Sequence, residues 1–194
     1  TLAERLNALL PGDFAKKSLF FSAGGEAVEN AIKIARYYTK RPALITFTNG
    51  YHGRSYMGMA LSARMIPFKQ GFGPFPSDIY RLPFPDEFHG ISLEDTKRAF
   101  ATLFRSDCPP DQIAAIFFEP VQGEGGYNIA TPEFVEYLRD LCDAHGIVLV
   151  ADEIQSGMGR TGKMFAMEHF GIHPDLSCVG KSIGGGLPIS GVVG

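Results

Sequence analysis

The sequence contains no long apolar run, no cluster of basic residues and no closely spaced cysteines. A membrane-spanning helix needs roughly 20 consecutive apolar residues, whereas an apolar block such as 146–151 has the length of a buried strand. The 18 basic and 21 acidic side chains give a net charge of -3, and no Lys/Arg-rich segment is present that could neutralise nucleic-acid phosphates. We therefore expect neither a membrane nor a nucleic acid as a partner.

Cysteines are few, and Cys108, Cys142 and Cys178 are widely spaced. An odd number without a CxxC pair or zinc spacing is typical of reduced thiols in a cytoplasmic protein. The five histidines show no ligand-like clustering, so we expect packing or surface roles for them and no metal site.

The ends of the sequence indicate a piece of a longer chain. Thr1 is not a start methionine, no signal-peptide pattern follows it, and residues 188–194 stop within a strand-like run. We therefore expect the chain to be one segment of a single domain. Targeting to an organelle by a missing N-terminal part stays open.

Apolar segments of strand length alternate with segments of helical periodicity, which predicts an α/β fold with a mostly parallel sheet. Strands are expected at 18–22, 43–48, 113–118, 147–151 and 176–179. Helices are expected at 2–10, from the turn at 22–26 to about 38, and at 54–63, 92–105 and 131–145. Residues 66–90 carry many Gly, Pro and Phe, so we expect a long irregular segment there.

Polar residues follow three of the expected strands. Tyr51 and His52 follow one strand, Glu119 follows the next, and Asp152 follows a third. Ligands of open α/β sheets bind at the carboxyl edge of the strands, so these residues are candidates for one site. Glu153 would point to the opposite side if its strand continued.

Two glycine-rich turns are candidates for a phosphate site. The turn 22–26 offers backbone N–H groups at a helix N-terminus, which suits either a phosphate cup or an ordinary strand-to-helix turn. The segment 157–162 matches GxGxxG, but residues 152–156 separate it from the preceding strand, and no acidic residue stands about 20 positions onward. This context argues against a dinucleotide site, which stays a remote alternative.

Lys181 stands between an apolar strand and three consecutive glycines. Residues 180–182 resemble the end of a P-loop, but Asp175 occupies the place of its first glycine. Apolar surroundings lower the pKa of an amine and free it to act as a nucleophile or base, which is typical of a Schiff-base lysine.

Five segments together resemble the class-III (ω-amino acid) aminotransferases, which depend on pyridoxal 5'-phosphate. They are SAGGEAVENAIKIAR (22–36), YHGRS (51–55), EPVQGEGG (119–126), ADEIQ (151–155) and GKSIGGGLP (180–188). The resemblance implies the fold type I large domain, with a mostly parallel sheet and helices on both faces. It also implies that residues 1–194 are its central part, without the N-terminal segment, the rest of the large domain and the C-terminal small domain. Family members work as homodimers or dimers of dimers.

The resemblance assigns the cofactor site. It implies that Lys181 forms the Schiff base and then shuttles the proton, and that Asp152 bonds the pyridine nitrogen. Gly24 and Gly25 are expected to hold the phosphate through backbone N–H groups, and Tyr51 to stack on the ring.

The resemblance also assigns the substrate side. Gln155 is expected near the ring hydroxyl, and Arg54 as the clamp for a substrate carboxylate. Glu124 is expected to switch between two substrates, and Glu119 to line the site. One departure is Gly25, where the family usually has Ser or Thr, so we expect somewhat weaker cofactor binding.

Segments 27–33 and 71–75 are most similar to bacterial 4-aminobutyrate aminotransferases. The expected reaction converts 4-aminobutyrate and 2-oxoglutarate to succinate semialdehyde and glutamate. Ornithine, acetylornithine or another ω-amine is the second candidate for the amino donor. Outside this family, a dinucleotide-dependent oxidoreductase and a non-catalytic binding domain remain as hypotheses, and the presence of both Lys181 and Asp152 argues against the binding domain.

Overall fold

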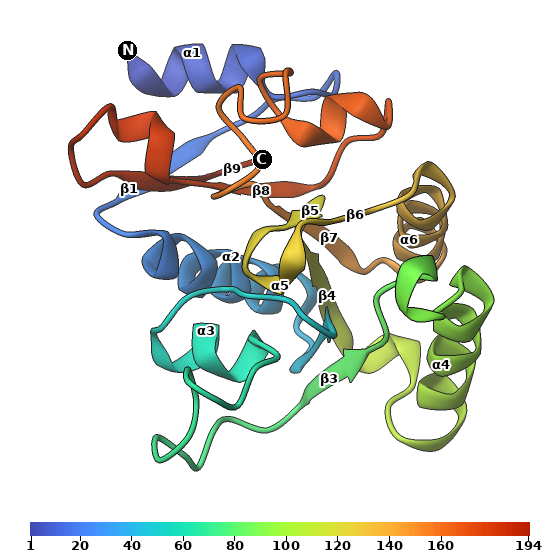
Figure 1. Cartoon of the computed structure of the whole chain (residues 1–194). Helices are drawn as coiled ribbons and strands as arrows, with labels where there is room; N and C mark the ends of the chain where they lie inside the picture. The colour runs from blue at the N-terminus through green and yellow to red at the C-terminus, as the bar shows by residue number, and fades with distance from the viewer.

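The computed structural model describes all 194 residues, and a seven-stranded sheet runs through its centre in the order β1-β9-β8-β7-β4-β2-β3 (Figure 1). The strands are β1 Ser18–Phe21, β2 Ala43–Phe47, β3 Ile79–Leu82, β4 Ile113–Phe118, β7 Val148–Asp152, β8 Leu176–Val179 and β9 Ser190–Val193. Only β9 runs antiparallel to its neighbours, and all other adjacent pairs are parallel. The predicted α/β fold with a mostly parallel sheet is confirmed.

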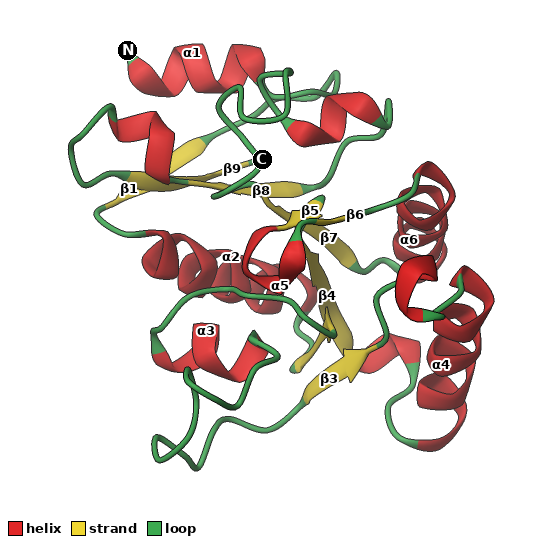
Figure 2. Cartoon of the chain, in the orientation of Figure 1, coloured by secondary structure: helices red, strands yellow, loops and turns green.

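Helices cover both faces of this sheet (Figure 2). Helix α2 (Gly24–Thr39) lies on one face, and α4 (Leu93–Ser106) and α6 (Pro132–His145) lie on the other. Because side chains alternate along a strand, β4 sends Ile116 and Phe118 into the core under α4 and α6. Its residues Ala115 and Phe117 enter the core under α2.

The smaller elements join these layers. They are the helices α1 (Leu2–Leu9), α3 (Tyr56–Leu61) and α5 (Gly123–Gly126), the strands β5 (Val121–Gln122) and β6 (Asn128–Ile129), and the 3-10 helices η1 (Glu87–His89), η2 (Pro110–Gln112), η3 (Ala166–His169) and η4 (Lys181–Gly184).

Local sequence signals set the ends of the long helices. Thr131 caps α6 by accepting a hydrogen bond from the backbone of Phe134, and Pro132 occupies the first helical position. Gly146 ends the helix with φ 62°, the left-handed conformation that glycine adopts without steric cost. These boundaries match the prediction.

The prediction for residues 66–90 is wrong in part. Strand β3 lies inside this segment and pairs in parallel with β2 at the edge of the sheet, and η1 follows. An edge strand is only half buried, so Ile79, Tyr80 and Arg81 show no apolar run. Helix α3 is also shorter than predicted, because Ser55 and Ser62, which flank it, both have extended backbone.

Cys108, Cys142 and Cys178 are buried and not disulfide-bonded. No helix combines the length and the apolar character required to cross a lipid bilayer. No group of three or more His, Cys, Asp or Glu side chains is arranged to hold a metal ion.

Candidate active site

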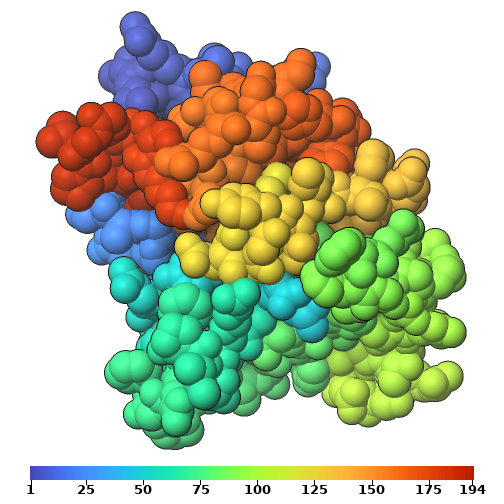
Figure 3. All heavy atoms as spheres, viewed as in Figure 1, coloured from blue at the N-terminus to red at the C-terminus, as the bar shows by residue number.

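The carboxyl ends of β2, β4, β7 and β8 surround a cavity of about 420 Å³. Its lining consists of residues 23–26, 51–55, Glu119, Asp152, Ile154, Gln155 and Lys181. In Figure 3, the segment near residues 120–130 lies between the segment that follows residue 50 and the segment that precedes the C-terminus. The chain thus brings distant segments of the sequence to one sheet edge, and every predicted site residue except Glu124 lines the cavity.

The N-terminus of α2 opens into this cavity. The Glu26 carboxylate accepts the N–H groups of Ser22 and Ala23 at 2.9 and 2.8 Å, and the N–H groups of Gly24 and Gly25 have no partner in the chain. The positive end of the helix dipole adds to these free donors. The turn can therefore bind an anion such as a phosphate.

Backbone approaches closely around Gly25. A Cβ atom on Gly25 would lie 3.3 Å from Ser55 Oγ, and a Cβ on Gly53 would lie 3.1 Å from the Gly25 Cα. The Ser55 hydroxyl is buried without a hydrogen-bond partner, although its residue stands at the N-cap of α3. A polar group without a partner therefore stands beside the predicted phosphate turn.

Asp152 ends β7 and is only 4% exposed. Its Oδ2 accepts a hydrogen bond from His52 Nδ1 at 2.8 Å, and its Oδ1 accepts one from the backbone of Ile154 at 3.2 Å. Burial lowers the pKa of His52, but the hydrogen bond and the charge of Asp152 outweigh it and leave that pKa raised.

The sequence analysis placed His52 and Asp152 among the candidates for one site at the carboxyl edge of the sheet, and the structure brings both of them there. It expected no more than a packing or surface role for the histidine, so the direct bond of His52 to Asp152 was not predicted. His52 is buried, as packing would require, but it also fixes a residue of the cavity.

Lys181 is the first residue of η4, and its side chain reaches the cavity. Its Nζ donates a hydrogen bond to Gln155 Oε1. Partial burial lowers the pKa of this amine, the Asp152 carboxylate opposes that effect, and the Arg160 guanidinium adds to it. The amine is therefore closer to its uncharged, nucleophilic form than an ordinary lysine.

Glu119 joins two loops of the site. Its Oε1 accepts the N–H of Tyr51 at 2.7 Å, and its Oε2 accepts the N–H of Gly123 at 3.3 Å. The side chain is 5% exposed, and burial raises its pKa to about 7. The Tyr51 ring packs against Phe68 with 5.0 Å between centroids, so the ring is supported from the segment after α3.

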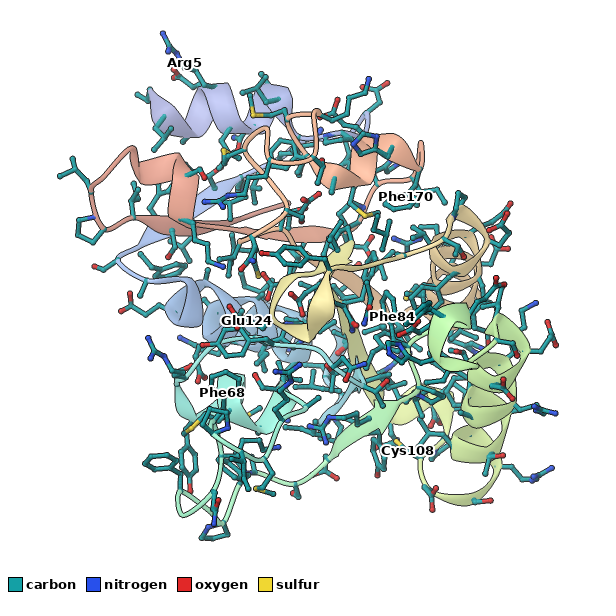
Figure 4. The ribbon with its side chains drawn as sticks, viewed as in Figure 1. Arg5, Phe68, Phe84, Cys108, Glu124 and Phe170 are labelled. Carbon is teal, nitrogen blue, oxygen red and sulfur yellow. The ribbon has the colours of Figure 1, made fainter.

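Like Lys181, the site residues Arg54 and Glu124 are exposed. Neither forms a hydrogen bond or an ion pair through its side chain. Figure 4 labels Glu124 on α5 and Phe68 on the segment after α3. Glu124 does not line the cavity, but its charge raises the pKa of Tyr51 and opposes the lowering of the pKa of Lys181.

The GxGxxG segment 157–162 forms successive turns, and the next helix, the four-residue 3-10 helix η3, begins only at Ala166. A dinucleotide fingerprint needs the N-terminus of a helix at this place. The structure therefore contradicts the dinucleotide hypothesis.

Comparisons with known proteins agree with the geometry. The sequence model of the family "Aminotransferase class-III" matches residues 1–194. A 5-aminovalerate aminotransferase of Pseudomonas putida is 52% identical over 193 residues, and a 4-aminobutyrate aminotransferase of Escherichia coli is 51% identical over 193 residues. Both alignments cover 100% of this chain and 45% of the relative, so the chain spans less than half the length of these proteins.

Solved structures show the same fold. A transaminase from a marine Virgibacillus superposes with a TM-score of 0.88 at 30% identity, over 99% of this chain and 44% of that chain. An amine transaminase from an uncultivated Pseudomonas species, in its PLP-bound form, gives a TM-score of 0.84 at 29% identity, over 99% of this chain and 46% of that chain.

Proposed function

Because the chain belongs to the class-III aminotransferase family, we propose that the full-length protein is a pyridoxal-phosphate-dependent transaminase of ω-amino acids. Residues 1–194 are then the central part of its large, cofactor-binding domain. The observation that carries the proposal is the meeting of the Lys181 amine, the Asp152 carboxylate and the N-terminus of α2 in one cavity.

The preferred reaction transfers the amino group of 4-aminobutyrate to 2-oxoglutarate, which gives succinate semialdehyde and glutamate. Relatives named for 4-aminobutyrate and for 5-aminovalerate are about equally similar, so the five-carbon donor is the second candidate. Ornithine and acetylornithine are further candidates. We also propose a homodimer, which sedimentation of the full-length protein tests.

The residues around the cavity suit pyridoxal 5'-phosphate, the cofactor that the family and a PLP-bound structural relative imply. The free N–H groups of Gly24 and Gly25 are donors for its phosphate, and the Ser55 hydroxyl without a partner lies beside them. The Asp152 carboxylate is an acceptor for a protonated ring nitrogen. When bound, the cofactor supplies an aldehyde that accepts the amino group and a ring that withdraws electrons from the reacting carbon.

Each residue then has a defined task. Asp152 keeps a proton on the ring nitrogen, and His52 holds the Asp152 carboxylate in place through the bond at 2.8 Å. Tyr51 and Gln155 line the same cavity, where Tyr51 would stack on the ring of the cofactor and Gln155 would hold its hydroxyl. Lys181 is the nucleophile toward the aldehyde, and its Nζ later takes up and returns the proton of the substrate carbon.

Arg54 is the substrate clamp in this proposal. A guanidinium binds a carboxylate through two parallel hydrogen bonds, and Arg54 lines the cavity without an internal ion pair. Glu119 and Glu124 add negative charge around the amine of Lys181. Glu124 is the candidate switch between two substrates, because its exposed carboxylate has no partner within this chain.

The test is borohydride reduction of the full-length protein in the presence of pyridoxal 5'-phosphate, followed by peptide mass mapping. We expect a reduced pyridoxyl group on Lys181, and no such group at this position in Lys181→Ala. A folded, cofactor-loaded protein without the group on Lys181 would overturn the proposal.

Substrate choice needs a separate measurement. Initial rates with 4-aminobutyrate, 5-aminovalerate, ornithine and acetylornithine rank the amino donors. Because the amino group is held on the protein between two half-reactions, double-reciprocal plots at several 2-oxoglutarate concentrations are expected to be parallel. Intersecting lines would contradict a ping-pong transfer.

A further inference from the structure

The glycine-rich loop 157–162 has no task in the proposed function, yet it touches the turn that carries the reactive lysine. Arg160 Nε donates a hydrogen bond to Ser182 Oγ at 3.0 Å, and Ser182 is the residue next to Lys181. Arg160, the one arginine of this GxGxxG segment, therefore links the segment to the turn that carries Lys181.

The loop is held firmly at both ends by one buried carboxylate. Glu153 is 1% exposed and accepts hydrogen bonds from Ser156 Oγ at 2.7 Å, Ala166 N at 3.0 Å and Met167 N at 2.9 Å. Glu153 directly follows Asp152, so the loop is anchored to the end of β7 and thereby to the cavity. The backbone segment that carries Arg160 is therefore anchored on both sides.

The same loop also packs against the lysine turn through apolar side chains. Met158 and Ile183 contact one apolar cluster that includes Phe165 and Val179. Val179 and Ile183 stand on either side of residues 180–182. The loop and the lysine turn thus share one apolar cluster, in addition to the hydrogen bond of Arg160.

The lysine turn needs such external support. Lys181 has φ 48°, a left-handed conformation that is unfavourable for a residue with a side chain. The backbone bonds at the two ends of this short helix run from Ile183 N to Gly180 O at 3.2 Å and from Gly185 N to Ser182 O at 3.3 Å. Conformations of this kind persist where the surrounding structure enforces them.

We propose that Arg160 is a positioning residue for Lys181, which it serves by holding the strained turn through Ser182 and by adding positive charge beside the amine. The inference rests on the proposed function, in which Lys181 is the attachment point of the cofactor. It gives the loop 157–162 a role that does not involve a nucleotide.

The charges that face the lysine amine come from four segments. Asp152 at the end of β7, Glu119 after β4 and Glu124 on α5 favour the charged ammonium, whereas Arg160 and burial favour the free amine. Removing the guanidinium leaves burial alone to oppose the three carboxylates. The pKa of Lys181 is then expected to rise, and less free amine is present at neutral pH.

Arg160 is suited to substitution because its side chain is exposed and borders an open cavity of about 290 Å³. Loss of this side chain creates no closed void in the core, so Arg160→Gln is expected to fold. Lys163 is the matched control, since it lies three residues further on, is exposed and forms no hydrogen bond or ion pair. Lys163→Gln removes the same charge from the same segment.

The first measurement uses the cofactor-free full-length protein. Competitive acetylation with acetic anhydride over a range of pH, followed by peptide mass mapping, gives the pH midpoint at which Lys181 reacts. We expect Arg160→Gln to move this midpoint to higher pH, Lys163→Gln to leave it unchanged, and Arg160→Lys to fall between wild type and Arg160→Gln. An unchanged midpoint in Arg160→Gln, with or without a lower melting temperature, would overturn the inference.

The second measurement separates the contact from the charge. Ser182→Ala keeps the guanidinium but removes its acceptor, so borohydride-trapped attachment of pyridoxal 5'-phosphate to Lys181 is expected to be slower than in wild type. Attachment at the wild-type rate would contradict the role of the Ser182 bond. If wild-type Lys181 takes up no cofactor while Arg160→Gln still moves the acetylation midpoint, the proposed function fails and the inference about Arg160 stands.

Discussion

His52 Nδ1 lies 2.8 Å from Asp152 Oδ2, and the two side chains are 1% and 4% exposed. A carboxylate only accepts hydrogen bonds, so Nδ1 carries the hydrogen. On the other side of the ring, Nε2 lies 3.2 Å from Thr46 Oγ1. The residues are 100 positions apart in the sequence, and they meet because β4 alone separates β2 from β7 in the sheet.

Replacing His52 by Leu is expected to destabilise the cofactor-free protein by about 2–4 kcal/mol, because Asp152 would remain buried with one backbone donor. His52→Asn is the matched variant, since its amide nitrogen takes nearly the place of Nδ1 and can donate to Asp152. Chemical denaturation of the full-length protein measures both. Equal stabilities of the Leu and Asn variants would show that the hydrogen bond contributes nothing.

Glu119 predicts a dependence of stability on pH. Its pKa of about 7 in the folded chain exceeds the ordinary value of 4.5 that it regains on unfolding. The folded state therefore binds the proton more tightly, so its relative stability is highest at low pH and declines as the pH rises through 4.5 toward 7. Above about pH 7 the ionised, buried carboxylate costs the folded state up to a few kcal/mol.

Glu119→Gln removes this titration. We expect the free energy of unfolding of the variant, relative to wild type, to increase between pH 5 and pH 8 in the cofactor-free protein. Urea denaturation of both proteins at several pH values measures that difference, and the other titrating groups cancel in it. A difference that stays constant over this range would contradict the raised pKa.

Much of the sheet and its polar edge follows from local sequence. Buried strands such as β4 and β7 consist of apolar residues alone up to their last positions, and Gly146 ends α6 where predicted. Strand β3 could not be predicted because its residues are half buried and show no apolar run. Its pairing with β2 is a contact between separate segments, which the local sequence does not encode.

The site was less accessible to sequence reasoning than the fold. Motif resemblance selected residues that the structure places around one cavity, Lys181 and Asp152 among them. It assigned no role to His52, which only its position at the sheet edge had indicated, and none to Glu153 or Arg160. The roles of these three residues consist of contacts with other segments. A sequence pattern does not reveal such contacts, except where a residue type is unusual for its sequence surroundings.

Glu153 is expected to hold the loop 157–165 in its folded conformation. All three of its partners are donors, so Glu153→Gln turns an amide N–H toward at least one N–H or hydroxyl group. We expect a loss of roughly 1–3 kcal/mol and faster amide hydrogen exchange in the loop. Glu133→Gln on the exposed start of α6 is the control, since this side chain forms no hydrogen bond. Exchange in the loop at the wild-type rate would contradict the anchoring role.

Gly25 allows the phosphate turn to be tested by adding a single hydroxyl. A serine at this position would place an oxygen near the free N–H groups at the start of α2, and one hydrogen bond to the phosphate contributes about 0.5–1.5 kcal/mol. We therefore expect Gly25→Ser to lower the dissociation constant of pyridoxal 5'-phosphate by about two- to tenfold.

The structure adds a cost to that substitution. The new Cβ would lie 3.3 Å from Ser55 Oγ, so Ser55 must move by a few tenths of an ångström. Gly25→Ala has the same Cβ without the hydroxyl and therefore measures the crowding alone. Fluorescence titration of the full-length apoprotein with the cofactor compares the two variants with wild type. If Gly25→Ser binds no more tightly than Gly25→Ala, the added hydroxyl does not reach the phosphate, and the turn does not hold the cofactor in the way proposed.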